Sequence, residues 1–463
     1  MSKKMRLEKD LLGELEVPED VYWGINTQRT LSYFNISQRK FPKVFLYALA
    51  LVKRACLSAN QKSGIIDAKI AKAMYQAIDE MLNEGKFFDQ FPIDVFQTGS
   101  GTQINMNMNE VLANRANEIL GQPKGTKNPV NPNDHVNRSQ SSNDVIPTAM
   151  HLASVNLIQK NLLPALEFLE KNLEQKIKEF KGIIKVGRTH LQDAVPIPLS
   201  TEFSVYLEQI RTTKKRLMAV LDELYYLPIG GTALGTGLNT PKNFDQLVVD
   251  ALSQLIGYKY KSNPVKAEGI SSHNTIVHVS SVLRLLALSV MKMANDIRWM
   301  GSGPRAGLGE LHIPENEPGS SIMPGKINPT QSEALIQVCL QVIGNDTAIS
   351  YAESTSSLLD LNVAKPIMIV NLLESISILS TGIESFVRFC LKDLSANIDN
   401  INEALSKSLM IITRLTPIIG YEKAGEIAKK AHETGKTIKE IIQEMDLNIE
   451  EDLDELLDPR KMV

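Results

Sequence analysis

Residues 319–329 (GSSIMPGKINP) gather the groups that a reaction next to a carboxylate needs. Ser320 and Ser321 supply two hydroxyls, Lys326 an ammonium and Asn328 a carboxamide. Glycine and proline at both ends favour a mobile loop with hinge points. Such a loop could hold a carboxylate while a hydroxyl reacts; the plain alternative is a surface turn with polar decoration.

Three further polar stretches could complete a site: residues 97–103 (QTGSGTQ), 139–145 (SQSSNDV) and 187–194 (GRTHLQDA). Ser141 to Asp144 read as the N-cap of a helix, and capping is compatible with anion binding because a helix N-terminus attracts carboxylates. His190 stands alone in its stretch, and a lone histidine is more often structural than catalytic.

The sequence carries no sign of a cofactor or a metal. It has no P-loop, no HExxH and no metal-ligand spacing among its seven histidines, and the glycines of residues 230–237 (GGTALGTG) do not have dinucleotide-binding spacing. The three cysteines, Cys56, Cys339 and Cys390, lie far apart in apolar text and read as buried side chains. We therefore expect side chains and backbone amides to do any chemistry.

Composition excludes several functional classes. The chain has 463 residues, 43% of them hydrophobic, and a net charge of −3, which supports neither nucleic acid nor membrane binding. The N-terminus is charged and lacks the apolar core of a signal peptide, and no uncharged run of about 18 residues predicts a membrane span. A cytoplasmic location is the expectation.

Helices must position these groups. Apolar residues recur every three or four positions over residues 162–180, and residues 201–226 look similar. Residues 274–299, 333–351 and 366–392 are apolar on most sides, so each must be buried on most sides. One chain offers few neighbours for that, and we expect a homo-oligomer with a helical-bundle core. Strand signals are confined to residues 182–187 and 311–315.

Polar, Gly/Pro-rich text suggests domain boundaries near residues 140 and 395. We expect an N-terminal domain (1–140) with the first polar stretch. A central helical-bundle domain (141–395) would carry His190 and the mobile loop, and a small helical C-terminal domain (396–463) would follow.

The pattern GSSxMPxKxNP resembles the signature of the fumarase/aspartase superfamily, and the resemblance extends over nearly the whole chain. It implies a mainly α, three-domain fold whose long central helices form a multi-helix core in a homotetramer, with active sites shared between three subunits. Four stretches resemble class II fumarases in particular: residues 97–116, 139–151, 187–194 and 313–331. Aspartase is the alternative, although aspartases typically carry Gln where this chain has His190 and Thr where it has Ser142.

The resemblance implies a cofactor-free fumarate hydratase of the tricarboxylic acid cycle. It would eliminate water from L-malate in the anti sense, reversibly, through a carbanion with aci-carboxylate character. Ser320 would be the general base, activated by Lys326 and neighbouring loop amides, and His190 would pair with Glu333 to protonate the departing hydroxyl. The residues implied to bind substrate are Ser100, Gly101, Thr102, Ser141, Ser142, Asn143, Thr189, Ser321, Lys326 and Asn328.

A second, peripheral dicarboxylate site occurs in many fumarases, with a basic residue and a histidine just before Pro-Asn-Asp. Here Asn128 and Asn131 stand in those places, so a site formed by Asn131, Pro132, Asn133 and Asp134 would be weak or absent.

Other functions need different evidence. Release of ammonia from aspartate would indicate the aspartase, and a structural protein of the lens-crystallin kind would tolerate the loss of Ser320 or Lys326, both of which are present. A simple dicarboxylate-binding module has no need of a mobile loop flanked by glycines.

Overall fold

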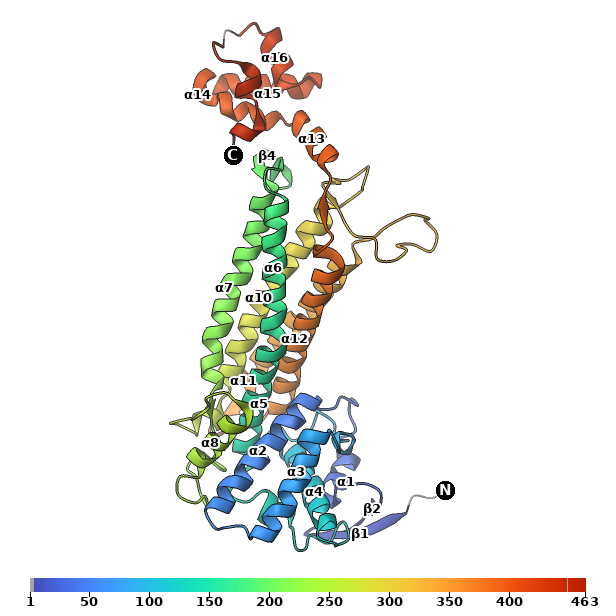
Figure 1. Cartoon of the computed structure of the whole chain (residues 1–463), viewed down its shortest axis with the longest axis vertical. Helices are drawn as coiled ribbons and strands as arrows, with labels where there is room; N and C mark the ends of the chain where they lie inside the picture. The colour runs from blue at the N-terminus through green and yellow to red at the C-terminus, as the bar shows by residue number, and fades with distance from the viewer. Residues whose placement is uncertain (1–3, 448) are drawn as a thin grey trace. The chain divides into compact units, whose positions relative to one another are not determined.

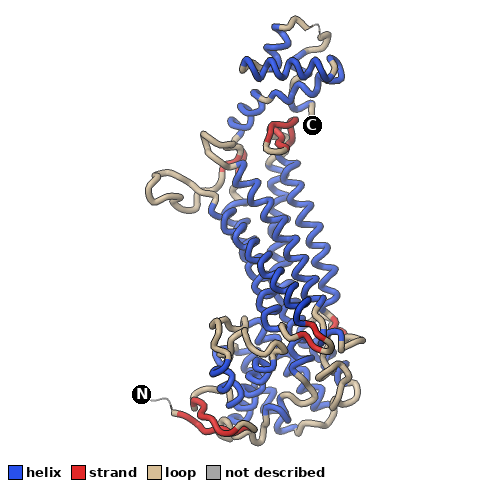
Figure 2. The backbone as a smooth tube through the Cα atoms, turned by 180° about the vertical axis from the view of Figure 1, so that it is seen from behind, coloured by secondary structure: helices blue, strands red, loops and turns tan. Residues whose placement is uncertain are grey.

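The computed structural model describes residues 4–447 and 449–463, and helices dominate it (Figures 1 and 2). The chain forms two compact units. Unit 1 comprises the residues up to Leu163 together with Lys215–Leu285 and Gln341–Leu379. Unit 2 comprises Pro164–Lys214, Leu286–Leu340 and Ser380–Val463. The mainly α fold class expected from the sequence is confirmed.

Unit 1 is built around α2, whose side chains from Phe45 to Asn60 are nearly all buried. This helix packs against α3, α5 and α8, and α3 packs against α4 (Figure 1). The elements are β1 Met5–Asp10, β2 Gly13–Pro18, α1 Ile25–Tyr33, α2 Lys43–Lys62, α3 Ala68–Glu84, α4 Thr102–Ile119, α5 Ser142–Leu157, β5 Tyr226–Leu227, α8 Phe244–Ile256, β6 Lys261–Ser262, α9 Glu268–Ser271, β8 Ser357–Leu358 and β9 Leu361–Asn362. Short helical turns occur at Phe88–Gln90, Pro132–Val136 and Ile158–Leu162.

Four long helices contribute residues to both units: α7 Leu199–Leu224, α10 Asn274–Met300, α11 Thr330–Ser356 and α12 Lys365–Phe386. The sequence predictions of helices over 162–180, 201–226, 274–299, 333–351 and 366–392 are confirmed to within a few residues. By length and composition, α10 and the stretch Lys365–Leu391 could each cross a membrane. However, 50% and 67% of their apolar windows are already buried within the chain, as in core helices.

Unit 2 contains α6 Leu163–Glu179, apart from its first residue, and its share of the long helices. The pair Lys214–Glu170, 3.3 Å apart, joins α7 to α6, and the Tyr206 hydroxyl donates to Asp296 of α10 over 3.0 Å. The remaining elements are β3 Ile184–Thr189, β4 Gln192–Pro198, β7 Leu311–His312, β10 Ser395–Ala396, α13 Ile398–Lys407, α14 Thr416–Ile419, α15 Tyr421–Thr434, α16 Ile438–Glu444 and α17 Leu453–Leu456, with helical turns at Val387–Leu391, Leu409–Leu415 and Pro459–Lys461.

Within the described residues the strands form five two-stranded sheets. The strand expected at 182–187 exists but runs Ile184–Thr189, whereas the one expected at 311–315 is only Leu311–His312. The antiparallel hairpin of β1 and β2 was not expected from the charged N-terminal text. The three-domain division and the oligomeric state stay predictions.

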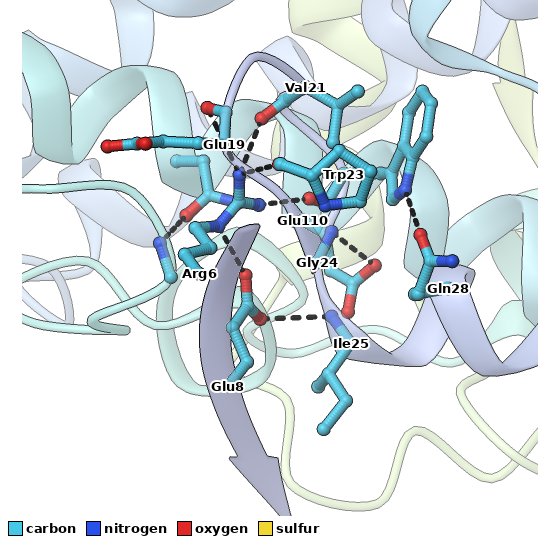
Figure 3. Close-up of polar contacts among 12 residues, drawn as sticks. Arg6, Glu8, Glu19, Val21, Trp23, Gly24, Ile25, Gln28 and Glu110 are labelled. Carbon is cyan, nitrogen blue, oxygen red and sulfur yellow. Dashed lines mark hydrogen bonds and ion pairs between the residues drawn. The ribbon is translucent and has the colours of Figure 1, made fainter. Parts of the chain in front are cut away.

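Glu8 fixes this N-terminal hairpin to the start of α1, because its buried carboxylate accepts from the Ile25 amide over 2.9 Å (Figure 3). The Arg6 guanidinium donates to the carbonyl oxygens of Pro18 (2.6 Å), Val21 (2.9 Å) and Trp23 (2.5 Å), and to the Glu8 carboxylate (2.8 Å). Backbone carbonyls left over at a turn thus find donors from one side chain instead of water.

The N-terminus of α1 is capped by a carboxylate from another helix. Gly24, its N-cap residue, has no side chain to offer, and Glu110 of α4 accepts from the amides of Gly24 (3.0 Å), Asn26 (2.8 Å) and Thr27 (3.0 Å). Burial raises the pKa of Glu110, which is 3% exposed, while these hydrogen bonds act in the opposite direction. A negative group at a helix N-terminus is stabilising, so Glu110 joins α1 to α4.

We expect Glu110→Ala to lower the free energy of unfolding by about 3 kcal/mol, because three buried amides lose their acceptor. Urea denaturation at fixed protein concentration measures the change. Glu403→Ala, which removes an exposed ion pair with Lys407, is the matched control and should have no measurable effect. Equal midpoints for both variants would contradict this role of Glu110.

Candidate active site

The first polar stretch leads into the N-terminus of α4, and two of its glycines are required by geometry. A Cβ atom on Gly99 would lie 1.4 Å from the carbonyl oxygen of Val363. Gly101, the N-cap residue, has φ +76°, a conformation that glycine adopts without strain. Gly101 offers no side-chain cap, and Gln97 Oε1 instead accepts from the Ile104 amide over 3.0 Å, while Ser100 and Thr102 lie beside the start of the helix.

The second stretch forms the N-terminus of α5 with a capping box, as the capping interpretation predicted. Ser141 accepts from the Asn143 amide over 3.2 Å, and Asp144 accepts from the Ser141 amide over 2.9 Å. The Asn143 carboxamide donates to the Ala233 carbonyl oxygen over 2.9 Å. The half-buried hydroxyl of Ser142 remains at the first turn of this helix.

The structure brings these two helix N-termini together. The Thr102 Oγ1 atom is 2.8 Å from Ser100 Oγ and 2.9 Å from Ser142 Oγ, so three hydroxyls form one hydrogen-bonded chain. Two helix N-termini with hydroxyls between them offer neutral donors and positive dipole ends to one anion. The chemistry that this arrangement favours is binding of a carboxylate.

Asp144 holds the N-terminus of α5 through its carboxyl group. It was not among the site residues expected from the sequence. Its side chain is fully buried, and besides the Ser141 amide it accepts from the amides of Gly230 (3.0 Å) and Thr232 (2.9 Å). Burial raises the pKa of Asp144 to about 7 against these hydrogen bonds. The Ser-Ser-Asn-Asp order signalled a cap, but the loop that shares the carboxylate lies 86 residues further along the chain.

In unit 2, His190 lies at the tip of the β3–β4 hairpin. Thr189 pairs with Gln192, so His190 and Leu191 form a two-residue turn with φ +56° and +60°. Both residues adopt the left-handed region, which costs about 1 kcal/mol or more for each non-glycine residue. The exposed imidazole makes no hydrogen bond or ion pair to any described residue and is free for a ligand.

A buried ion network holds this hairpin. Arg188 donates to the fully buried Glu310 carboxylate over 2.7 Å, and Lys185 lies 3.3 Å from the other oxygen of Glu310 and 3.0 Å from Glu202. Because these buried charges are paired with one another, the network keeps the strand that ends in Thr189 in one place. It also joins the hairpin to the chain that leads into residues 319–329.

The loop of residues 319–329 is closed by its own backbone. The Gly319 amide donates to the Lys326 carbonyl oxygen over 2.9 Å, and Asn328 Nδ2 donates to the Gly319 carbonyl oxygen over 2.6 Å. Ser320 Oγ accepts from the amides of Ile322 (3.2 Å) and Met323 (3.0 Å). A serine turn often has this pattern, and the same two donors would also stabilise negative charge on that oxygen.

The remaining expected groups of unit 2 are exposed. Ser321 and Lys326 lie on the surface of the loop, and Glu333 lies in the first turn of α11. The side chains of Lys326 and Glu333 make no hydrogen bond or ion pair within the described residues, so the expected pairing of Glu333 with His190 stays a prediction.

Asn131 of the doubtful second site is used as a cap. Its side-chain oxygen accepts from the amides of Asn133 (2.8 Å) and Asp134 (3.2 Å) in the turn that begins with Pro132. The Asn131 amide donates to Nδ1 of His135 over 2.9 Å. Elsewhere, the described residues contain no group of three or more His, Cys, Asp or Glu side chains placed to hold a metal ion.

The raised pKa of Asp144 predicts a specific pH dependence of stability. The folded chain keeps the carboxyl group protonated where the unfolded chain ionises it, so this stabilisation is full below about pH 4 and is lost as pH rises through about 7. Relative to Asp144→Asn, the unmodified chain should lose roughly 1 kcal/mol of unfolding free energy per pH unit between pH 5 and 7. Urea denaturation at several pH values measures this, and parallel curves for the two proteins would contradict it.

Comparison with known proteins agrees over the full length. Residues 13–344 match a family described as lyase, and residues 411–463 match the fumarase C C-terminus. A fumarate hydratase class II from Rickettsia felis is 49% identical over 461 residues, covering 100% of each chain. One from Campylobacter jejuni is 50% identical over 458 residues, covering 99% of this chain and 98% of that protein.

The crystal structure of a class II fumarase from Schistosoma mansoni superposes with a TM-score of 0.96 at 39% identity, covering 99% of both chains. Matches of this extent and identity show common family membership and not merely a common fold. The chain therefore belongs to the lyase family and, within it, to the class II fumarate hydratases.

Proposed function

We propose that the chain interconverts L-malate and fumarate by reversible anti-elimination of water in the tricarboxylic acid cycle, in the cytoplasm and without a cofactor. The observation that carries the proposal is the identity of about half of all residues, over the whole length, with fumarate hydratases. The same matches support a fumarate hydratase over an aspartase.

The two polar stretches of unit 1, residues 97–103 and 139–145 (the unit 1 loops), are suited to hold one substrate carboxylate. A carboxylate needs several convergent donors, and the Thr102 and Ser142 hydroxyls stand between two helix N-termini. Asn143 and Ser141 flank them, while Ser100 and Gly101 complete the approach to α4. Neutral donors bind the anion without an opposite charge that would have to be desolvated as well.

The unit 2 groups are suited to the reaction itself. Ser320, as an alkoxide, takes the C3 proton of malate, and the electron pair of that bond delocalises into the adjacent carboxylate. The C2–O bond then breaks, and the leaving hydroxide takes a proton from the His190–Glu333 pair and departs as water. Lys326 and Asn328 face the carboxylate on which negative charge develops.

A serine alkoxide requires stabilisation of its charge, and the loop offers it. The Ile322 and Met323 amides already donate to Ser320 Oγ. Preorganised amides stabilise an oxyanion more than water does because they do not need to reorient. The Lys326 ammonium, which makes no hydrogen bond or ion pair with the described residues, adds a positive charge to the same loop.

We further propose a homotetramer in which each active site takes its groups from three chains. Large apolar side chains remain exposed on the long helices, among them Val205 of α7, Leu288 and Trp299 of α10, and Leu340 of α11, at 46–58% exposure. Burial of such side chains against copies of the same helices would supply the driving force for assembly.

Absorbance of fumarate near the ultraviolet edge tests the activity directly. Purified protein with L-malate should give rising absorbance, and L-aspartate should give none. Ser320→Ala should lower kcat by about 10²–10⁴-fold because the general base is lost, whereas Ser406→Ala on α13 should keep full turnover. Turnover of aspartate alone, or full malate turnover by Ser320→Ala, would contradict the proposal.

A further inference from the structure

Lys53 is a buried lysine in the middle of the apolar helix α2. It is 1% exposed, and none of the described carboxylates forms an ion pair with it. Its ammonium donates to Asn137 Oδ1 over 3.0 Å and to Gln140 Oε1 over 2.9 Å. Burial lowers the pKa of Lys53 to about 7. Burial of a lysine ammonium costs free energy that burial of an apolar side chain would not, and this cost suggests that Lys53 has a role other than stability.

The two acceptors of Lys53 belong to the segment between α4 and α5. Asn137 Oδ1 also accepts from Asn105 (3.1 Å) and Asn109 (3.2 Å), one and two turns into α4. Gln140 directly precedes Ser141, the N-cap residue of α5. The Asn137 carboxamide in turn donates to the Gln140 carbonyl oxygen over 3.2 Å. One ammonium therefore ties α2 to the body of α4 and to the start of α5.

We propose that Lys53 is a positioning residue for the substrate: it holds the N-termini of α4 and α5 at the spacing at which Thr102 and Ser142 bind one carboxylate. The inference rests on the proposed function of these two loops. The two hydroxyls lie 2.9 Å apart, so their spacing can change little before the hydrogen bond is lost. A displacement of about 1 Å at such a site can remove most of the contribution of the displaced group.

Removal of Lys53 should act on binding more than on the chemical step. The unit 1 loops hold a carboxylate that is present in the substrate and in the transition state alike, and loss of such uniform binding raises KM with little change in kcat. We expect Lys53→Met, which keeps the length of the side chain, to raise KM for L-malate about tenfold and to change kcat less than about threefold.

A double-mutant cycle with Thr102→Val separates positioning from a general loss of stability. In the unmodified enzyme Thr102→Val should raise KM about tenfold; in the Lys53→Met background it should add less than about threefold, because the hydroxyl is already misplaced. Lys176→Met is the matched control. Lys176 is also buried, at 4% exposure, but its ammonium donates to Leu394 and Glu179 of unit 2, and the effect of Thr102→Val should be undiminished there.

If Lys53→Met does not fold, Gln140→Met tests the inference, because it removes one acceptor and leaves Lys53 with Asn137. The KM of the Gln140→Met enzyme should rise, and its double-mutant cycle with Thr102→Val should also be non-additive. Unchanged KM in the Lys53 and Gln140 variants, or fully additive cycles, would overturn the inference. No malate turnover by the unmodified enzyme would instead refute the proposed function, and an unaffected Thr102→Val enzyme would refute the binding role of the loop.

Discussion

The hydrogen bond between the hydroxyls of Thr102 and Ser142 requires the N-termini of α4 and α5 to lie at one definite spacing. Several contacts within unit 1 maintain this spacing. Gly99 lets the first stretch lie against the Val363 carbonyl oxygen, and the buried Asp144 carboxyl group fixes the second stretch to the loop at Gly230. Glu110 joins the same helix α4 to α1. These contacts are mostly polar and buried, so they are directional, and directional contacts define positions better than apolar packing does.

Unit 2 presents its groups differently. The side chains proposed to react are exposed and make few hydrogen bonds of their own, whereas hydrogen bonds and ion pairs hold the backbone that carries them. His190 sits on a turn with two left-handed residues, above a strand held by the Arg188–Glu310 ion pair. Ser320 Oγ already accepts hydrogen bonds from the backbone amides of Ile322 and Met323. Backbone strain and buried charge of this kind concentrate at functional sites, where geometry matters more than stability.

The sequence predicted the long helices well because apolar periodicity is a local property. Residues 162–180 repeat every three or four positions, and the helix found there is Leu163–Glu179. The β1–β2 hairpin escaped notice because its stability comes from distant partners: Arg6 is satisfied by carbonyl oxygens up to 17 residues away. The turn at His190 escaped as well, since it lacks the Asn-Gly signal that normally marks two left-handed residues. Lys53 offered only the weak signal of one charge in an apolar helix.

For the site, residue types and family resemblance indicated which side chains to expect there, and the helix cap at Ser141 was predicted from local order alone. The contacts that position them could not be predicted, because Asp144 with Gly230 and Lys53 with Asn137 join segments about 80 or more residues apart. Sequence periodicity carries no information on such pairs.

We propose that residues 97–103 and 139–145 of one chain complete the reactive groups of another. Complementation tests it most directly. An enzyme carrying Ser320→Ala and one carrying both Thr102→Val and Ser142→Ala are each purified alone and after co-expression as mixed oligomers. If sites are shared, the mixed oligomers should turn over L-malate far faster than the sum of the two separate enzymes, because some sites then combine intact groups from both chains. Activity no greater than that sum, in oligomers shown to contain both chains, would mean that each chain builds its own site.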